Sequence, residues 1–114
     1  MRVYLNGHFM PLADAKVSVL DRGFVFGDGV YEVVPVYSHK PFRLEEHLRR
    51  LQGSLDGIRL ANPHGVATWR ELIEQLIALQ DFDDQSVYLQ ITRGVAPRDH
   101  AFPAGVAPTV FMFA

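Results

Sequence analysis

Residues 19–37 read VLDRGFVFGDGVYEVVPVY, and the interpretation of the whole chain starts from this stretch. Its first half holds three glycines, two aspartates and an arginine between apolar residues. Glycine is used where backbone dihedrals are special or where another group approaches the backbone closely. We therefore expect residues 21–29 to form a site and not only a turn.

The second half of this stretch predicts a β-strand, because the residues after Gly29 are mainly β-branched and aromatic. Side chains alternate between the two faces of a strand. One face should carry Tyr31, Val33 and Pro35, and the other Val30, Glu32, Val34 and Val36. Proline lacks an amide donor, so the strand should lie at a sheet edge or carry a bulge near its end.

The flanking sequence predicts more strands and two helices. Asn6-Gly7 between short apolar runs is typical of a hairpin turn. Apolar residues spaced by four and three predict a helix over residues 44–58, in which Gly53 and Gly57 suggest the close approach of a neighbouring element. A second helix should start with a capping box over residues 68–71. The predicted elements are completed by strands over residues 86–93 and 109–113.

From this order we expect an α+β fold with a mostly antiparallel sheet and two main helices packed on it. The chain stops inside its last predicted strand, which we expect to be unpaired and prone to association. We therefore predict that residues 1–114 are one domain of a longer protein.

Composition excludes several classes of function. A net charge of -2, spread without blocks, gives no footprint for nucleic acid or a membrane surface. There is no cysteine, and the five histidines show no paired metal spacing, so we expect neither thiolate chemistry nor a metal site. The first residues lack an apolar leader and no run is long enough to span a membrane, so a cytoplasmic location is expected.

Single polar residues are ambiguous when each is considered alone. Arg43, His47 and Arg50 recur at helical spacing and should leave the first helix in nearly one direction. By default a helix arginine is solvated or forms a structural ion pair. Arg98 and His100, two apart in a loop rich in turn residues, would ordinarily be surface residues.

Three separated motifs change this assessment when they are taken together. They are Asp21-Arg22-Gly23 followed by FGDGVYE at residues 26–32, RLEEHLRRL at residues 43–51, and TRG at residues 92–94 with PRDH at residues 97–100. In order and spacing they resemble the N-terminal domain of the fold-type IV (class IV) pyridoxal phosphate aminotransferases. The last loop is most similar to that of the D-amino acid (D-alanine) aminotransferases. The resemblance covers essentially all 114 residues.

The resemblance implies roles for particular residues. Arg50 would hold the phosphate of pyridoxal 5'-phosphate, for which a planar guanidinium is suited. Tyr31 and Val33 would line the substrate side of the site. Arg98 and His100, together with Tyr31, would bind the substrate carboxylate, with the loop pair contributed by the partner subunit of a homodimer. The implied reaction is D-alanine plus 2-oxoglutarate giving pyruvate plus D-glutamate.

The chain departs from the family pattern in its lysines. It has only Lys16 and Lys40, and neither matches the family's Schiff-base lysine, which lies in a C-terminal domain. We expect the full-length protein to be an enzyme acting on an amino acid and a keto acid, and the 114-residue chain alone to be inactive. The alternatives are a branched-chain L-amino acid aminotransferase or an aminodeoxychorismate lyase of the same fold, or a non-catalytic, stand-alone dimerisation fragment.

Overall fold

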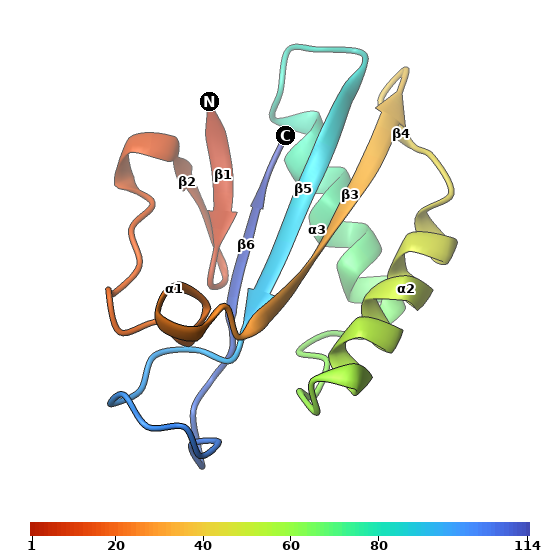
Figure 1. The fold of residues 1–114 in the computed structure, drawn as a ribbon. Helices are drawn as coiled ribbons and strands as arrows, with labels where there is room; N and C mark the ends of the chain where they lie inside the picture. Colours follow the sequence, from red (N-terminus) through yellow and green to blue (C-terminus); the bar gives the residue numbers. More distant parts are fainter.

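A computed structural model of residues 1–114 shows a six-stranded antiparallel sheet with two long helices on one face (Figure 1). The strand order is β2-β1-β6-β5-β3-β4. The strands are β1 (Arg2–Leu5), β2 (His8–Pro11), β3 (Gly29–Tyr37), β4 (Lys40–Pro41), β5 (Gln85–Thr92) and β6 (Thr109–Phe113). The helices are α1 (Arg22–Phe26), α2 (Leu44–Gly57) and α3 (Val66–Ala78), with one 3-10 turn at Leu12–Asp14. The α+β fold predicted from the sequence is confirmed.

The first hairpin forms where Asn6-Gly7 predicts it. Leu5 pairs with His8, and the two turn residues have φ angles of 47° and 95°. Positive φ at both central positions matches the right-handed twist of the flanking strands.

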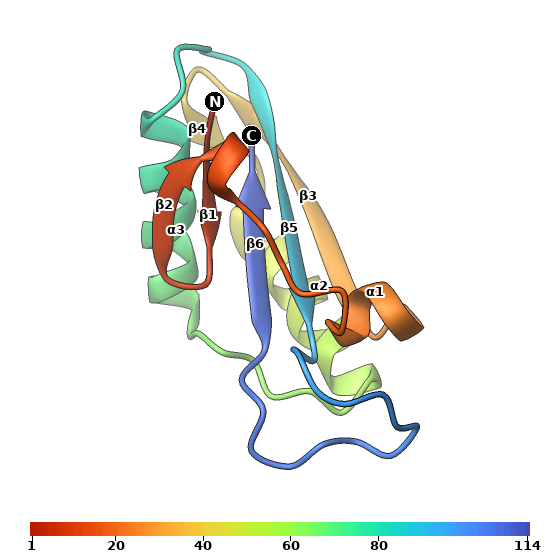
Figure 2. The same cartoon turned by 90° about the vertical axis from the view of Figure 1, so that its left-hand side faces the viewer.

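The last strand was predicted to be unpaired, and that prediction is wrong. β6 lies inside the sheet, between β1 and β5, with Met112 opposite both Tyr4 and Leu89. The first and last strands are therefore neighbours although they lie at opposite ends of the chain, and Figures 1 and 2 show both termini at the same end of the sheet.

β3 and β5 form the longest ladder, in register from Gly29 opposite Thr92 to Val36 opposite Gln85. On its other side β3 pairs with β4 only at Val36 and Tyr37. Most of β3 is thus a sheet edge, as Pro35 predicts, and no bulge interrupts the ladder. The side-chain alternation is also as predicted, with Glu32 buried and Tyr31 exposed.

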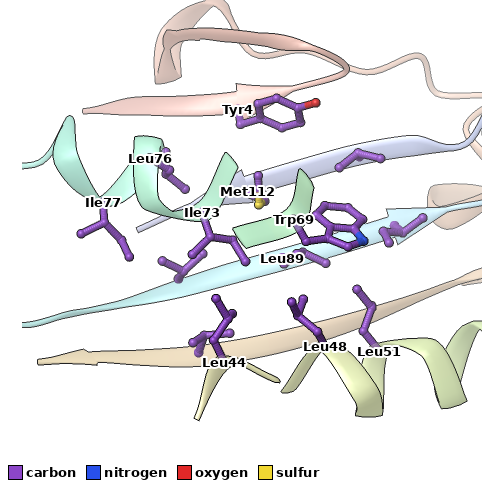
Figure 3. Close-up of a cluster of buried hydrophobic side chains, with 14 of the residues drawn as sticks. Tyr4, Leu44, Leu48, Leu51, Trp69, Ile73, Leu76, Ile77, Leu89 and Met112 are labelled. Atoms are coloured by element: carbon purple, nitrogen blue, oxygen red, sulfur yellow. The ribbon is translucent and has the colours of Figure 1, made fainter. Parts of the chain in front are cut away.

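The core lies between the sheet and the two long helices (Figure 3). The helices contribute Leu44, Leu48, Leu51, Leu55, Trp69, Ile73, Leu76 and Ile77, all buried. Burying each such side chain stabilises the fold by about 1.5–3 kcal/mol. Neither long helix is long and apolar enough to serve as a membrane span.

Two details of the helices differ from prediction. α3 starts at Val66 with Gly65 as N-cap, so Thr68 lies inside the first turn and no side chain caps the helix. In α2, no atom lies within 4 Å of a methyl group placed at Gly53 or Gly57. Both face open space, and neither marks a close approach.

Candidate active site

The glycine-rich stretch forms a short helix, α1, which the sequence pattern did not reveal. Asp21 caps its start by accepting the Gly23 amide at 2.8 Å, and Gly27 ends it with a φ of 64°. A methyl group at Gly23 would overlap the Thr92 side chain. Gly27 thus adopts a left-handed conformation and Gly23 allows a close approach of Thr92, the two uses of glycine that were expected here.

Asp21 also fixes α1 to the sheet. Its second carboxylate oxygen accepts a 2.6 Å hydrogen bond from the Thr109 hydroxyl at the start of β6, and Asp21 is only 2% exposed. The backbone of Asp21 forms an isolated bridge with Val95. The helix therefore lies beside both ends of the loop that joins β5 to β6, and Figure 2 shows the two at the same end of the sheet.

Behind α1, Asp28 is shared by two buried arginines. One of its oxygens accepts from Arg22 Nε and from Arg93 Nε, each at 2.8 Å. Arg93 also donates to the carbonyls of Ile58 and Arg59 just beyond α2. This cluster links α1, β5 and the end of α2.

The Asp28 carboxyl has a pKa below its ordinary value. Burial alone raises the pKa, but hydrogen bonds and charge attraction from Arg93 and Arg22 outweigh it. The carboxylate therefore stays ionised and holds both guanidinium groups.

The loop between β5 and β6 carries Arg98 and His100, both exposed. Each lies against the ring of Phe26 in α1. The Arg98 guanidinium carbon is 5.1 Å from the ring centroid and the His100 ring is 5.5 Å from it. Arg22 donates a 2.6 Å hydrogen bond to the carbonyl of Asp99, the residue between them.

Arg50 lies at the open edge of β3. Its Nε is 3.5 Å from a carboxylate oxygen of Glu32, which is 4% exposed. The other Glu32 oxygen is 2.9 Å from His47 Nδ1. The helical stripe predicted from the sequence is thus partly right, since His47 and Arg50 meet at Glu32, whereas Arg43 pairs with Glu46.

The terminal nitrogens of Arg50 have no partner in the chain, and its side chain is 75% exposed. A guanidinium that is free at its two terminal nitrogens can bind an oxyanion in a bidentate manner. This donor set fits a phosphate group.

Tyr31 and Val33 leave β3 on the face away from α2 and α3. They line a shallow hollow of about 450 Å³ together with Arg50 and Ser54. The Tyr31 ring stacks on Tyr88 of β5 at 5.7 Å. Burial raises the pKa of the Tyr88 hydroxyl, and Tyr31 adds to this, so Tyr88 stays neutral and donates to Gln90.

The five predicted residues fall into two groups. Tyr31, Val33 and Arg50 share the hollow at the β3 edge. Arg98 and His100 lie at α1, and no hydrogen bond, ion pair or ring contact within the chain joins them to the first group. No group of three or more His, Asp or Glu side chains is placed to hold a metal ion.

The supporting residues Glu32, His47 and Phe26 were not identified as functional from the sequence alone. The one signal that could have found Glu32 is an acidic residue alternating into the apolar face of a strand opposite a basic helix stripe. Nothing in the sequence pairs Phe26 with a loop that lies so far along the chain.

Comparison with known proteins gives the family. The sequence model of the amino-transferase class IV family matches residues 29–114. The chain belongs to the class IV aminotransferases.

Two relatives of this class IV aminotransferase chain are D-alanine aminotransferases. The protein of Listeria monocytogenes serotype 1/2a (strain 10403S) is 46% identical over 104 residues, which is 90% of this chain and 36% of the relative. The protein of Staphylococcus haemolyticus is 40% identical over 114 residues, or 99% and 40% of the two chains. This chain thus spans well under half the length of the curated relatives it matches.

Solved structures show the same fold. The branched-chain amino acid aminotransferase of Escherichia coli superposes with a TM-score of 0.90 at 27% identity, over 98% of this chain and 38% of that one. The 4-amino-4-deoxychorismate lyase of Pseudomonas aeruginosa gives 0.79 at 32% identity, over 96% and 38%. The branched-chain amino acid aminotransferase of Thermoproteus uzoniensis, solved with norvaline, gives 0.81 at 24% identity, over 98% and 39%.

Proposed function

We propose that residues 1–114 are the N-terminal domain of a D-amino acid aminotransferase that converts D-alanine and 2-oxoglutarate to pyruvate and D-glutamate. The observation that carries this proposal is the pair Arg98 and His100, held on the same side of one anchored loop. Together they offer several hydrogen-bond donors to one carboxylate. The identity of 40% and 46% to D-alanine aminotransferases supports the same substrate class.

The cofactor we propose is pyridoxal 5'-phosphate, which supplies the electron sink for transamination when bound. Arg50 would bind its phosphate through the two free terminal nitrogens. Glu32, itself paired with His47, would attract the guanidinium toward the β3 edge, because its buried carboxylate lies 3.5 Å from Arg50 Nε. Because neither Lys16 nor Lys40 matches the family's Schiff-base lysine, the catalytic lysine would come from outside residues 1–114.

On the substrate side, Tyr31 and Val33 would line one wall of the pocket. Stacking on Tyr88 limits the motion of the Tyr31 ring, and the Tyr31 hydroxyl would be available to the substrate carboxylate. Arg98 and His100 make no contact with this wall within one chain. This separation supports a homodimer in which each subunit lends its loop to the site of the other.

The sibling enzymes of the same fold share Arg50 and the β3 wall, and the pair Arg98 and His100 is the feature that argues against them. The test is therefore the substrate preference of the longer protein that carries this domain. We expect kcat/KM for D-alanine, measured as pyruvate formed with 2-oxoglutarate, to exceed that for L-leucine by more than about tenfold. A preference for L-leucine would favour the branched-chain enzyme. Release of pyruvate from 4-amino-4-deoxychorismate without any transamination would favour the lyase.

A loop substitution sharpens this test. Arg98→Gln should raise KM for D-alanine by about tenfold, because one charge-assisted hydrogen bond is lost. Arg59→Gln is the matched control, since its side chain is exposed, forms no ion pair and lies outside both residue groups. Equal effects of the two substitutions would remove Arg98 from the substrate site.

A further inference from the structure

The short helix α1 supports the loop that carries Arg98 and His100. The proposed function assigns no role to this helix. α1 is only five residues long, yet its position is fixed at both ends. Asp21 binds Thr109 and Asp28 binds Arg93, so both ends of the helix are tied to the two strands from which the loop emerges.

Two residues of α1 face the loop. Arg22 and Phe26 are four apart, so they lie on the same side of the helix. Arg22 is 4% exposed and its guanidinium carbon is 4.7 Å from the Phe26 centroid, so the arginine and the ring support each other.

Arg22 contacts the backbone of the loop, and Phe26 contacts its side chains. Arg22 holds the carbonyl of Asp99 at 2.6 Å, which fixes the chain midway between the two loop side chains. On either side of Asp99, both Arg98 and His100 lie against the Phe26 ring. The position and the direction of both side chains are therefore set by α1.

Charge balance explains why Arg22 can remain buried here. Asp28 neutralises part of the charge of both Arg22 and Arg93, and Arg22 bonds the Asp99 carbonyl and not its carboxylate. The Asp99 carboxylate instead accepts the Ala101 amide. The Arg22 guanidinium can therefore hold the loop backbone at Asp99.

We infer that Arg22 and Phe26 are positioning residues that preorganise Arg98 and His100 for the carboxylate of an α-amino acid; this inference rests on the proposed function. Neither residue touches substrate. They act by removing the conformational freedom that the loop would otherwise lose on binding.

The test compares Phe26→Leu with Phe24→Leu in the longer protein carrying this domain. Both substitutions remove one ring from the same helix, but Phe24 is 76% exposed and contacts neither Arg98 nor His100. The loss of both ring contacts predicts a rise of about tenfold in KM for D-alanine with Phe26→Leu. Because the loop binds ground state and transition state alike, kcat should stay within about twofold.

Hydrogen exchange followed by mass spectrometry gives a readout that does not depend on activity. Phe26→Leu should accelerate amide exchange in the peptide covering residues 95–105, and Phe24→Leu should not. Equal KM and exchange for the two variants, or a fall in kcat at constant KM, would overturn the inference.

A second variant covers the case in which Phe26→Leu does not fold. Arg22→Lys keeps the charge next to Asp28, but a single ammonium cannot span both Asp28 and the Asp99 carbonyl. It should raise KM and loop exchange in the same way, and unchanged values would overturn the inference. If the unsubstituted protein shows no transamination of D-alanine, the proposed function fails, whereas the exchange comparison still decides whether α1 holds the loop.

Discussion

Asp28 is a polar residue whose substitution should destabilise the fold strongly. It is the only carboxylate that contacts Arg22 and Arg93, both of which are buried. Asp28→Asn leaves two buried guanidinium groups without a counter-charge, so the free energy of unfolding at pH 7 should fall by about 3 kcal/mol. Urea unfolding of both proteins measures this difference. Asp56→Asn, on the exposed surface of α2, is the control and should change little.

The same residue gives a pH dependence with a definite sign. The folded pKa of Asp28 lies below the ordinary value of 3.8. A depressed folded pKa contributes stability that is fully present above 3.8 and is lost as the pH falls through the folded value. The difference in free energy of unfolding between the unsubstituted protein and Asp28→Asn should therefore become smaller as the pH falls below 3.8. A gap that widens in acid would contradict the assignment.

Arg50 offers a second prediction for a single residue. Arg50→Ala should weaken pyridoxal phosphate binding by about 100-fold, since two charge-assisted hydrogen bonds are lost. Arg49→Ala is the matched control, because Arg49 directly precedes Arg50 in α2, is exposed and makes no ion pair. Equilibrium dialysis of the longer protein measures the affinity, and equal losses for both variants would remove Arg50 from the phosphate site.

Local rules predicted part of this site and missed the rest. Strand alternation placed Tyr31 and Val33 on one face, and helical spacing brought His47 and Arg50 to one side. The partner of these basic residues, Glu32, comes from packing α2 against β3. That contact depends on tertiary structure, which no local pattern contains.

Among the elements, α1 shows why a sequence pattern fails for short helices. Five residues make little more than one turn, too few for a periodic signal, and one of them is glycine. Its stability comes from the Asp21 cap and from contacts with β5 and β6. α2, by contrast, carries enough repeats for the predicted range of residues 44–58 to match the observed Leu44–Gly57 to within one residue.

Two glycine substitutions test this view of the elements. Gly23→Ala in α1 should destabilise the fold by about 1–3 kcal/mol, because the new methyl group overlaps Thr92. Gly53→Ala in α2 should stabilise it by about 1 kcal/mol, since the site is open and alanine favours a helix. Urea unfolding of both variants should show opposite signs. Loss of stability at Gly53 would mean that a neighbour does approach α2.

At the scale of the whole molecule, the position of β6 could not be predicted from the sequence. Its length and composition identify a strand, but the choice between an edge and the centre depends on which strands pair across the chain. β1 and β5 both pair with it, so the last strand lies in the middle of the sheet. The hollow at the β3 edge, with Tyr31 and Arg50, and the β5–β6 loop, with Arg98 and His100, lie at separate places on one chain.

We propose that these two places belong to one active site formed by two subunits. A hybrid dimer tests it directly, with Arg50→Ala in one subunit and Arg98→Gln with His100→Gln in the other. If the loop acts in the partner's site, each hybrid has one intact site. At D-alanine concentrations well below KM, equal mixing should then restore about a quarter of the transamination rate, because half of the dimers are hybrids. If the mixture stays as inactive as the two parents although mass measurement shows hybrids, the loop does not complete a site across the dimer, and the account is wrong.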